Sequence, residues 1–209
     1  MKPVELVGAM RATFAKCAPK LSMVSNVLDL QKGAGVKNED VDLLKAMFDV
    51  RQYSCSFAVQ KVSEMEFQGT AQLRYIYGGS RFCIMAHWKD IALCLKELGK
   101  PVNGIIQLQK EFLHFGEAEV TKMKAMGLPI YTAQHGTSTL MYTPMGYMIC
   151  ESVLDGQPVV GLRLTACVAT RCPAAYPEFR DTLHEADPKS PAIPQMNALI
   201  RYMSTLPES

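Results

Sequence analysis

The sequence lacks a long apolar run: no segment approaches the roughly 18 uninterrupted apolar residues that a spanning helix needs. The first residues are also unlike a secretory signal, because Arg11 and Lys16 interrupt the apolar positions. Seven cysteines, an odd number, include no Cys-x-x-Cys pair of the kind used in zinc sites. We therefore expect a soluble intracellular protein from a reducing compartment, cytoplasmic or organellar, with free and mostly buried thiols.

Several functional signatures are missing as well. The chain has no glycine-rich phosphate loop and no Gly-x-Ser-x-Gly nucleophile elbow. It also lacks an excess of basic charge, since 22 basic and 20 acidic side chains give a net charge of +2 and alternate along the sequence. A nucleic-acid-binding domain usually carries a basic stripe or a much higher isoelectric point, so the charge pattern disfavours nucleic acid as a partner.

The first third of the chain has helical periodicity. After the N-cap residue Asn38, apolar residues continue in a heptad-like stripe, which predicts a long helix over residues 39–67. With the helical spacing before it, this gives a helical hairpin region over residues 1–69. The exposed side of the long helix would mediate docking or self-association, or the N-terminal helices would cover it within the chain. The predicted interaction residues are Leu44, Phe48, Arg51 and Val62.

The rest of the chain, residues 70–209, alternates between short strands and helices. Residues 72–77 and 81–86 read as a hairpin around Gly78-Gly79, and turn signals divide residues 129–168 into an antiparallel meander. Helices are expected at residues 88–98, 104–115, 117–126, 176–185 and 194–206. The fold class is therefore α+β: a helical N-terminal region followed by an antiparallel, partly barrel-like sheet with flanking helices.

A corner inside the meander carries a family resemblance. The segment Pro144-Met145-Gly146-Tyr147 resembles the Pro-x-Gly-aromatic corner of the jumonji-type cupin barrel. That resemblance implies an iron site, completed by a histidine two residues further on and by an earlier His-x-Asp/Glu pair. Here Ile149 occupies the position of the histidine and no His-x-Asp/Glu pair occurs, which implies a degenerate barrel without a metal or cofactor.

A wider resemblance covers the block that runs from residues 86–91 through residues 159–163. This block is similar to a domain that recurs in uncharacterised proteins of dinoflagellate algae. The resemblance implies fold and lineage, and it implies an intracellular setting, in some cases within a larger polypeptide.

Three groups of residues could carry chemistry outside that corner. His114, Glu117 and His135 could supply three ligands to iron or zinc. Cys150, beside Glu151 and near His135, is the best candidate nucleophile, but a thiol buried in an apolar strand has a raised pKa and packs as a small apolar group. Arg74, Tyr75, Tyr77 and Arg81 could form a stacking platform for single-stranded nucleic acid.

These patterns favour a non-catalytic structural or protein-interaction module, part of a larger assembly. We assign no catalytic residue and no cofactor from the sequence. The alternatives are a metal-dependent, oxygenase-like enzyme and a nucleic-acid-binding module.

Overall fold

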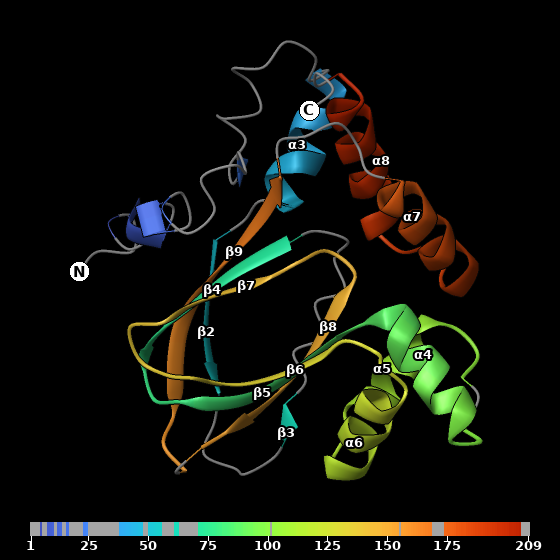
Figure 1. The fold of residues 1–209 in the computed structure, drawn as a ribbon. Helices are drawn as coiled ribbons and strands as arrows, with labels where there is room; N and C mark the ends of the chain where they lie inside the picture. The colour runs from blue at the N-terminus through green and yellow to red at the C-terminus, as the bar shows by residue number, and fades with distance from the viewer. Residues whose placement is uncertain are drawn as a thin grey trace.

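A computed structural model describes residues 71–100, 102–154, 156–168 and 174–205, together with residues 38–47, 50–55, 61–62 and a few positions before residue 25. These residues form an α+β fold with two antiparallel sheets and flanking helices (Figure 1). The α+β class, the antiparallel pairing and the flanking helices are as predicted. No pairing joins the two sheets within the described residues, so the strands there do not close into one barrel.

The first sheet has the order β1-β9-β4-β7, and β2 also pairs with β9. Its strands are β1 (Met23–Val24), β2 (Val50–Cys55), β4 (Ala71–Gly78), β7 (Leu140–Thr143) and β9 (Val159–Val168). The second sheet has the order β3-β8-β5-β6. Its strands are β3 (Lys61–Val62), β5 (Arg81–His87), β6 (Ile130–His135) and β8 (Tyr147–Val153).

Consecutive strands from β2 to β9 lie in different sheets, with β5 and β6 as the exception. Two predicted pairings were therefore wrong. Residues 72–77 and 81–86 are strands, but β4 pairs with β7 and β9, while β5 pairs with β6 and β8. Residues 129–168 contain four strands, but no two consecutive ones pair, so they are not a meander. The short loops between these strands carry the chain across to the other sheet instead of folding it back.

Gly79 is one such crossing point. Its φ angle of 81° favours glycine, and a Cβ atom there would lie 2.6 Å from the backbone oxygen of Pro158. The Gly78-Gly79 signal was recognised in the sequence, but it marks a connection between sheets and not a hairpin turn.

The two sheets face each other. Arg74 on β4 forms an ion pair with Glu151 on β8, and Ile76 on β4 packs with Val153 and Val159. Both faces of β4 are covered: Leu73 packs on the opposite side in a cluster that includes Met10. The space between the sheets is therefore part of the buried interior.

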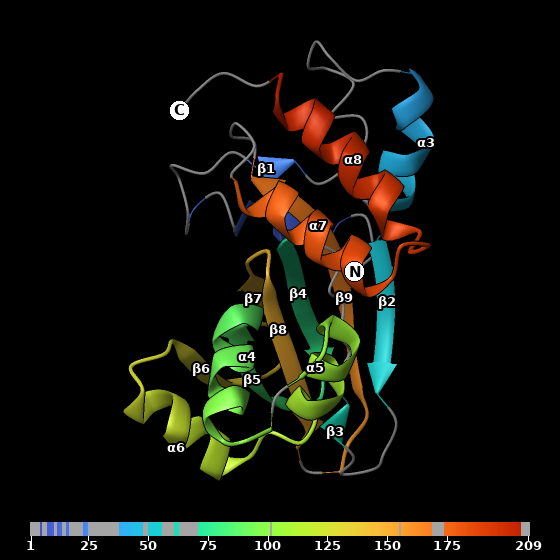
Figure 2. The ribbon, with the colours of Figure 1, turned by 90° about the vertical axis from the view of Figure 1, so that its right-hand side faces the viewer.

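Three helices cover the outer face of the second sheet (Figure 2). They are α4 (Trp88–Glu97), α5 (Ile105–Phe112) and α6 (Glu117–Ala125), each close to its predicted position. Their buried apolar side chains pack against Ile84, Ala86, Met148 and Cys150 of the sheet. Because the chain leaves β5 into these helices and returns in β6, both strands can lie in one sheet.

A second group of helices packs beyond the sheets: α3 (Asn38–Met47), α7 (Ala175–Ala186) and α8 (Ala192–Met203). Their core includes Leu44, Phe179 and Met196. Arg201 donates through Nε to Oδ2 of Asp40 at 3.0 Å, which ties α8 to α3.

The prediction of one helix over residues 39–67 was wrong. The helix α3 ends at Met47, and residues 50–55 form a strand that pairs with β9 along its whole length. The pairing of Val50–Cys55 with β9 overrode a helical spacing that is only a weak prior. Strands β2 and β3 pair with strands later in the chain, while the division of the chain at residue 69 stays a prediction.

The predicted interaction residues do not share one helix face. Leu44 lies on α3 and is buried in the helical core. Arg51 belongs to β2 and Val62 to β3, and Phe48 lies outside the described residues. The predicted docking helix is therefore not formed as proposed. In the part of the chain that the structure describes, no helix has the length and apolar character to cross a membrane.

Candidate functional site

The second sheet presents two chemically different faces. On β5, Arg81 and Cys83 point between the sheets, whereas Phe82 and Ile84 point toward the helices. The neighbouring strand β8 repeats this alternation with Glu151 inside and Cys150 outside. Each face forms a candidate site, one polar and sealed, the other apolar and open.

The inner site centres on the carboxylate of Glu151. Its Oε1 lies 2.9 Å from Nη1 of Arg74, and its Oε2 accepts from Nη1 of Arg81. The thiol of Cys83 donates to Oε1 at 3.8 Å. All four side chains are buried, with exposed fractions of 0–2%. The site is an arginine–glutamate–arginine cluster with a thiol beside it.

Electrostatics fixes the protonation of this cluster. Burial alone would raise the pKa of Glu151, but the guanidinium groups of Arg74 and Arg81 outweigh it and hold that pKa below its usual range. Burial and the same carboxylate raise the pKa of the Cys83 thiol. Glu151 is therefore ionised and Cys83 protonated at neutral pH. A protonated, sealed thiol is not a nucleophile.

His135 borders the same cluster from the end of β6. Its Nε2 lies 3.1 Å from the carbonyl oxygen of Thr139, and its Nδ1 has no hydrogen-bond partner among the described residues. A ring nitrogen of His135, the sulfur of Cys83 and a carboxylate oxygen of Glu151 all lie within 4.8 Å of one another. Burial is the main cause that lowers the pKa of His135, so the ring is neutral at neutral pH.

Strand register brings these residues together. Cys83 is paired with Glu151 across β5 and β8, and Arg81 with His135 across β5 and β6. Arg74 reaches in from β4 of the facing sheet and donates through Nε and Nη2 to Oε1 of Gln72, at 3.2 and 3.0 Å. Residues from four strands therefore meet in one cluster.

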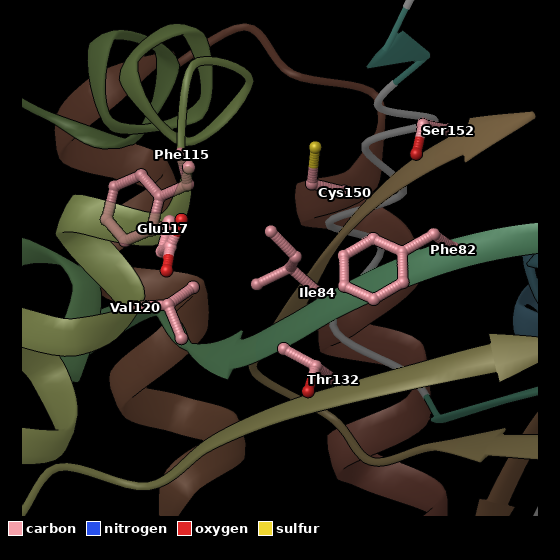
Figure 3. A pocket seen from close by; sticks show the side chains of 9 residues that line it. Phe82, Ile84, Phe115, Glu117, Val120, Thr132, Cys150 and Ser152 are labelled. Atoms are coloured by element: carbon pink, nitrogen blue, oxygen red, sulfur yellow. The ribbon is translucent and has the colours of Figure 1, made fainter.

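The outer site is an apolar pocket of about 270 Å³ (Figure 3). Its floor is the end of the sheet that α4–α6 leave uncovered, and its wall is the start of α6 with the loop before it. The floor residues are Phe82, Ile84, Thr132, Cys150 and Ser152, and the wall residues are Phe115, Gly116, Glu117 and Val120. Phe82 is 38% exposed, so the pocket opens to solvent at that end.

The strand β6 forms one side of this pocket and is the edge of its sheet. No described strand pairs with its outer edge, and residues 131–134 are all exposed. Tyr131 is 51% exposed. The strand contains no lysine, arginine, aspartate, glutamate or proline, the residues that usually protect a free edge.

The Pro144–Tyr147 corner has a structural role in this arrangement. The carbonyl oxygen of Gly146 accepts from the amide of Trp88 at 3.0 Å, which anchors the first residue of α4. A Cβ atom at Gly146, whose φ is 79°, would lie 2.6 Å from Nε2 of His87. Ile149, two residues after this corner, is buried.

The predicted metal ligands are not brought together. His114 and Glu117 are exposed on the helical side of the second sheet, while His135 is buried between the sheets. Within the described part of the chain, His135 instead lies with Cys83 and Glu151. The predicted trio was wrong because His114, in the α5–α6 connection, and Glu117, the first residue of α6, lie on the other face of the sheet.

The predicted nucleic-acid platform was also wrong. Arg74 and Arg81 are buried between the sheets, where no base or phosphate can reach them. Tyr75 packs on the opposite face of β4 from Arg74, in the cluster of Leu73. Tyr77 is exposed, and alone it makes no stacking platform.

The structure also places a different cysteine beside His135. Cys150 points toward the helices, where its thiol donates to the carbonyl oxygen of Leu113 at 3.9 Å. Cys83 takes the inner position. Its sequence signal was the alternation Arg81-Phe82-Cys83-Ile84, in which Arg81 shares the face of Cys83, but an arginine normally marks the solvent side.

Models of known protein families give no match to this sequence, and a search of curated proteins finds no similar one.

Proposed function

We propose that this protein is a non-catalytic protein-interaction module that binds an extended segment of a partner protein along β6. The observation that carries the proposal is the uncharged, exposed edge of β6 beside an apolar pocket. The partner segment would add a strand to the second sheet and place one apolar side chain in the pocket.

The edge itself supports strand addition. Free sheet edges present unpaired N–H and C=O groups, and proteins usually protect them with charges, prolines or bulges. The six residues of β6 carry none of these charges or prolines, and β6 pairs regularly with β5 along its other side. Such an edge is suited to main-chain hydrogen bonding with another chain.

The pocket indicates that the partner segment needs one apolar side chain to occupy it. Thr132 on the edge strand faces the pocket, next to Ile84 on β5. Alternate residues of an added strand would point to the same face, so one of them would lie over the pocket. The walls are mostly carbon, with the hydroxyls of Thr132 and Ser152 and the carboxylate of Glu117 as polar groups. An aliphatic or aromatic residue at that position fits best.

The same geometry favours a different protein over a second copy of this chain. On the pocket face, β6 offers Ile130, Thr132 and Gln134. Ile130 already packs against the helical core. An antiparallel β6–β6 pair would therefore bring threonine and glutamine to each pocket and leave its apolar walls exposed to water.

The sealed interior supports the absence of catalysis. Glu151 is held by two guanidinium groups, and the thiol of Cys83 is protonated and buried. A catalytic metal needs an open coordination position and access for substrate, and neither feature accompanies this buried cluster. This disfavours the metal-dependent oxygenase alternative.

We retain the resemblance to a degenerate jumonji-type cupin barrel as part of the proposal. Its support is the strand order: β2-β9-β4-β7 faces β3-β8-β5-β6, the alternation of a double-sheet jelly roll, which is the architecture of cupins. The aliphatic Ile149 in the position of the donor is consistent with a barrel that has lost its metal.

A peptide selection tests the proposal. Random decapeptides displayed on phage would be selected on the whole protein, and binding of the selected peptides measured by fluorescence polarisation. We expect peptides with one invariant aromatic or aliphatic residue, and protection of β6 amides from hydrogen exchange on binding. Ser152→Phe, which fills the pocket, should weaken binding at least tenfold, and the control Tyr77→Ala on the other sheet should not.

Two results would overturn the proposal. Selected peptides that bind wild type and Ser152→Phe equally would place recognition elsewhere. A dimer in light scattering that Thr132→Lys converts to monomer would show that β6 pairs with a second copy. Independently, stoichiometric iron with oxygen consumption in the purified protein would restore the oxygenase alternative.

A further inference from the structure

His135 is held in one tautomer by the loop after β6. Its Nε2 lies 3.1 Å from the carbonyl oxygen of Thr139. A carbonyl oxygen only accepts, so Nε2 carries the hydrogen and Nδ1 carries the lone pair. That lone pair is buried, because His135 is 3% exposed, and it has no hydrogen-bond partner among the described residues. Histidines that bind metals show this arrangement: the other ring N–H donates to a backbone carbonyl.

The sulfur of Cys83 provides a second soft donor near the His135 ring. It lies within 4.8 Å of a ring nitrogen of His135. Metal bonds of about 2.3 Å to sulfur and about 2.0 Å to nitrogen can together span about 4.3 Å between the two ligand atoms. The separation of the two donors, at most 4.8 Å, is therefore close to the span that one ion needs.

The neighbouring charges select the kind of ion. Arg74 and Arg81 contribute two positive charges and Glu151 one negative charge. A divalent ion that replaced the thiol proton would raise the net charge of this buried cluster by one, beside two guanidinium groups. A monovalent ion leaves the net charge unchanged. Sulfur and imidazole donors suit Cu(I), the soft monovalent ion among biological metals.

We propose that Cys83 and His135 bind one Cu(I) ion between the two sheets, through the Cys83 thiolate and Nδ1 of His135. One sulfur–hydrogen bond breaks, one sulfur–copper bond forms, and the proton leaves to solvent, so nothing is oxidised or reduced. Glu151 stays paired with the arginines. The site lies on the opposite face of the second sheet from the peptide pocket and is independent of the proposed function.

A copper competition experiment tests the site. Because the interior is sealed, the reduced, unfolded protein would be refolded without oxygen in the presence of Cu(I) buffered by bicinchoninate. We expect wild type to retain one more tight equivalent than Cys83→Ser, and His135→Gln to bind that equivalent at least tenfold more weakly. Cys150→Ser is the matched control, a buried thiol on the other face of the same sheet, and it should bind as wild type.

Copper bound by the other cysteines is present in both variants, so the difference in bound copper between Cys83→Ser and Cys150→Ser does not include it. X-ray absorption of the wild-type complex needs no variant and should show a site with sulfur and imidazole nitrogen as donors. The proposal is wrong if Cys83→Ser keeps the extra equivalent, if wild type binds none, or if Zn(II) displaces Cu(I) at equal concentration. Circular dichroism identifies a variant that has merely failed to fold.

Discussion

Cys83 and Cys150 are both buried on adjacent strands of one sheet, yet they face opposite environments. Cys83 lies among guanidinium, carboxylate and imidazole groups between the sheets. Cys150 lies among apolar side chains beneath the helices and lines an open pocket. A shift of one residue in register would exchange these faces, so strand alternation alone separates a sealed ionic interior from an open apolar pocket.

The two faces also differ in what keeps them intact. The inner face depends on charge balance, because each charged group is buried and needs its partners. The outer face depends on apolar packing under the helices and becomes open where that packing ends at Phe82. Perturbations should therefore be severe on the inside and mild on the outside.

The largest effect should come from Glu151→Ala. It would leave Arg74 and Arg81 buried without their carboxylate, and breaking a buried ion pair in this way costs about 3–5 kcal/mol. Urea unfolding monitored by circular dichroism measures this loss. Ser152→Ala, the next residue on the same strand but on the outer face, should change stability by less than about 0.5 kcal/mol. Equal losses would contradict the division between the faces.

Gly79→Ala should have the next largest effect, since it strains the crossing from β4 to β5. The positive φ and the backbone oxygen of Pro158 at 2.6 Å both oppose a side chain, with a cost of about 2–3 kcal/mol. Gly99→Ala is the matched control: its φ of 71° is also positive, but a Cβ atom there has open space. It should cost about 1 kcal/mol. Thermal unfolding measures both variants: Gly99→Ala reports backbone strain alone, and the additional loss in Gly79→Ala reports the steric conflict.

Acid should lower the free energy of unfolding, because protonation of the buried His135 ring disfavours the folded inner face. Its folded-state pKa lies below the ordinary 6.5, mainly because of burial, so the unfolded chain binds the proton more readily. The stability contribution is complete above about pH 6.5 and is lost as the pH falls below it. The groups facing the ring are Cys83, Glu151, Arg81 and Arg74.

Chemical denaturation from pH 7.5 to 5.5 measures this dependence, which His135→Gln should reduce. Part of the slope should remain, because burial also lowers the pKa of His87. His87→Gln should remove that second part. The pKa of Glu151 is lowered too, so its own contribution is lost only at lower pH, below the ordinary value of 4.5. A slope unchanged in both variants would contradict the assignment.

The smallest effect on stability should come from Phe82→Ser on the outer face. Phe82 is 38% exposed and lies outside the apolar cluster under the helices, so its loss should cost about 1 kcal/mol or less. Binding of the selected peptides should nevertheless fall sharply, because the pocket loses an aromatic group of its floor. If Phe82→Ser binds the peptides as tightly as wild type does, the pocket does not take part in peptide binding.

Much of the local structure could be predicted from the sequence. Gly99, Gly127 and the helical spacing of residues 88–126 placed three helices, and alternating side chains together with turn signals placed the strands after residue 70. The pairing of strands could not be predicted, because a short loop such as the one at Gly79 can fold a chain back or carry it to a facing sheet. The strand Val50–Cys55 was missed for a related reason: its partner β9 lies more than a hundred residues away.

The inner site could not be predicted from the sequence for a different reason. Arginine at positions 74 and 81 normally indicates a solvent-facing side of a strand, and burial of both depends on Glu151 reaching them from another strand. The sequence singled out His135 as a potential ligand, but its neighbours come from separate strands and share no motif. The apolar pocket likewise depends on how far α5 and α6 extend over the sheet.

The bare edge of β6 has a consequence for how the protein behaves when no other chain covers it. Incompletely folded copies carry extended segments that would pair with the same six residues, so insolubility would grow with expression level. A single lysine at Thr132 should reduce this aggregation, so the edge that we propose as the binding strand also limits how much of the free chain a cell can hold.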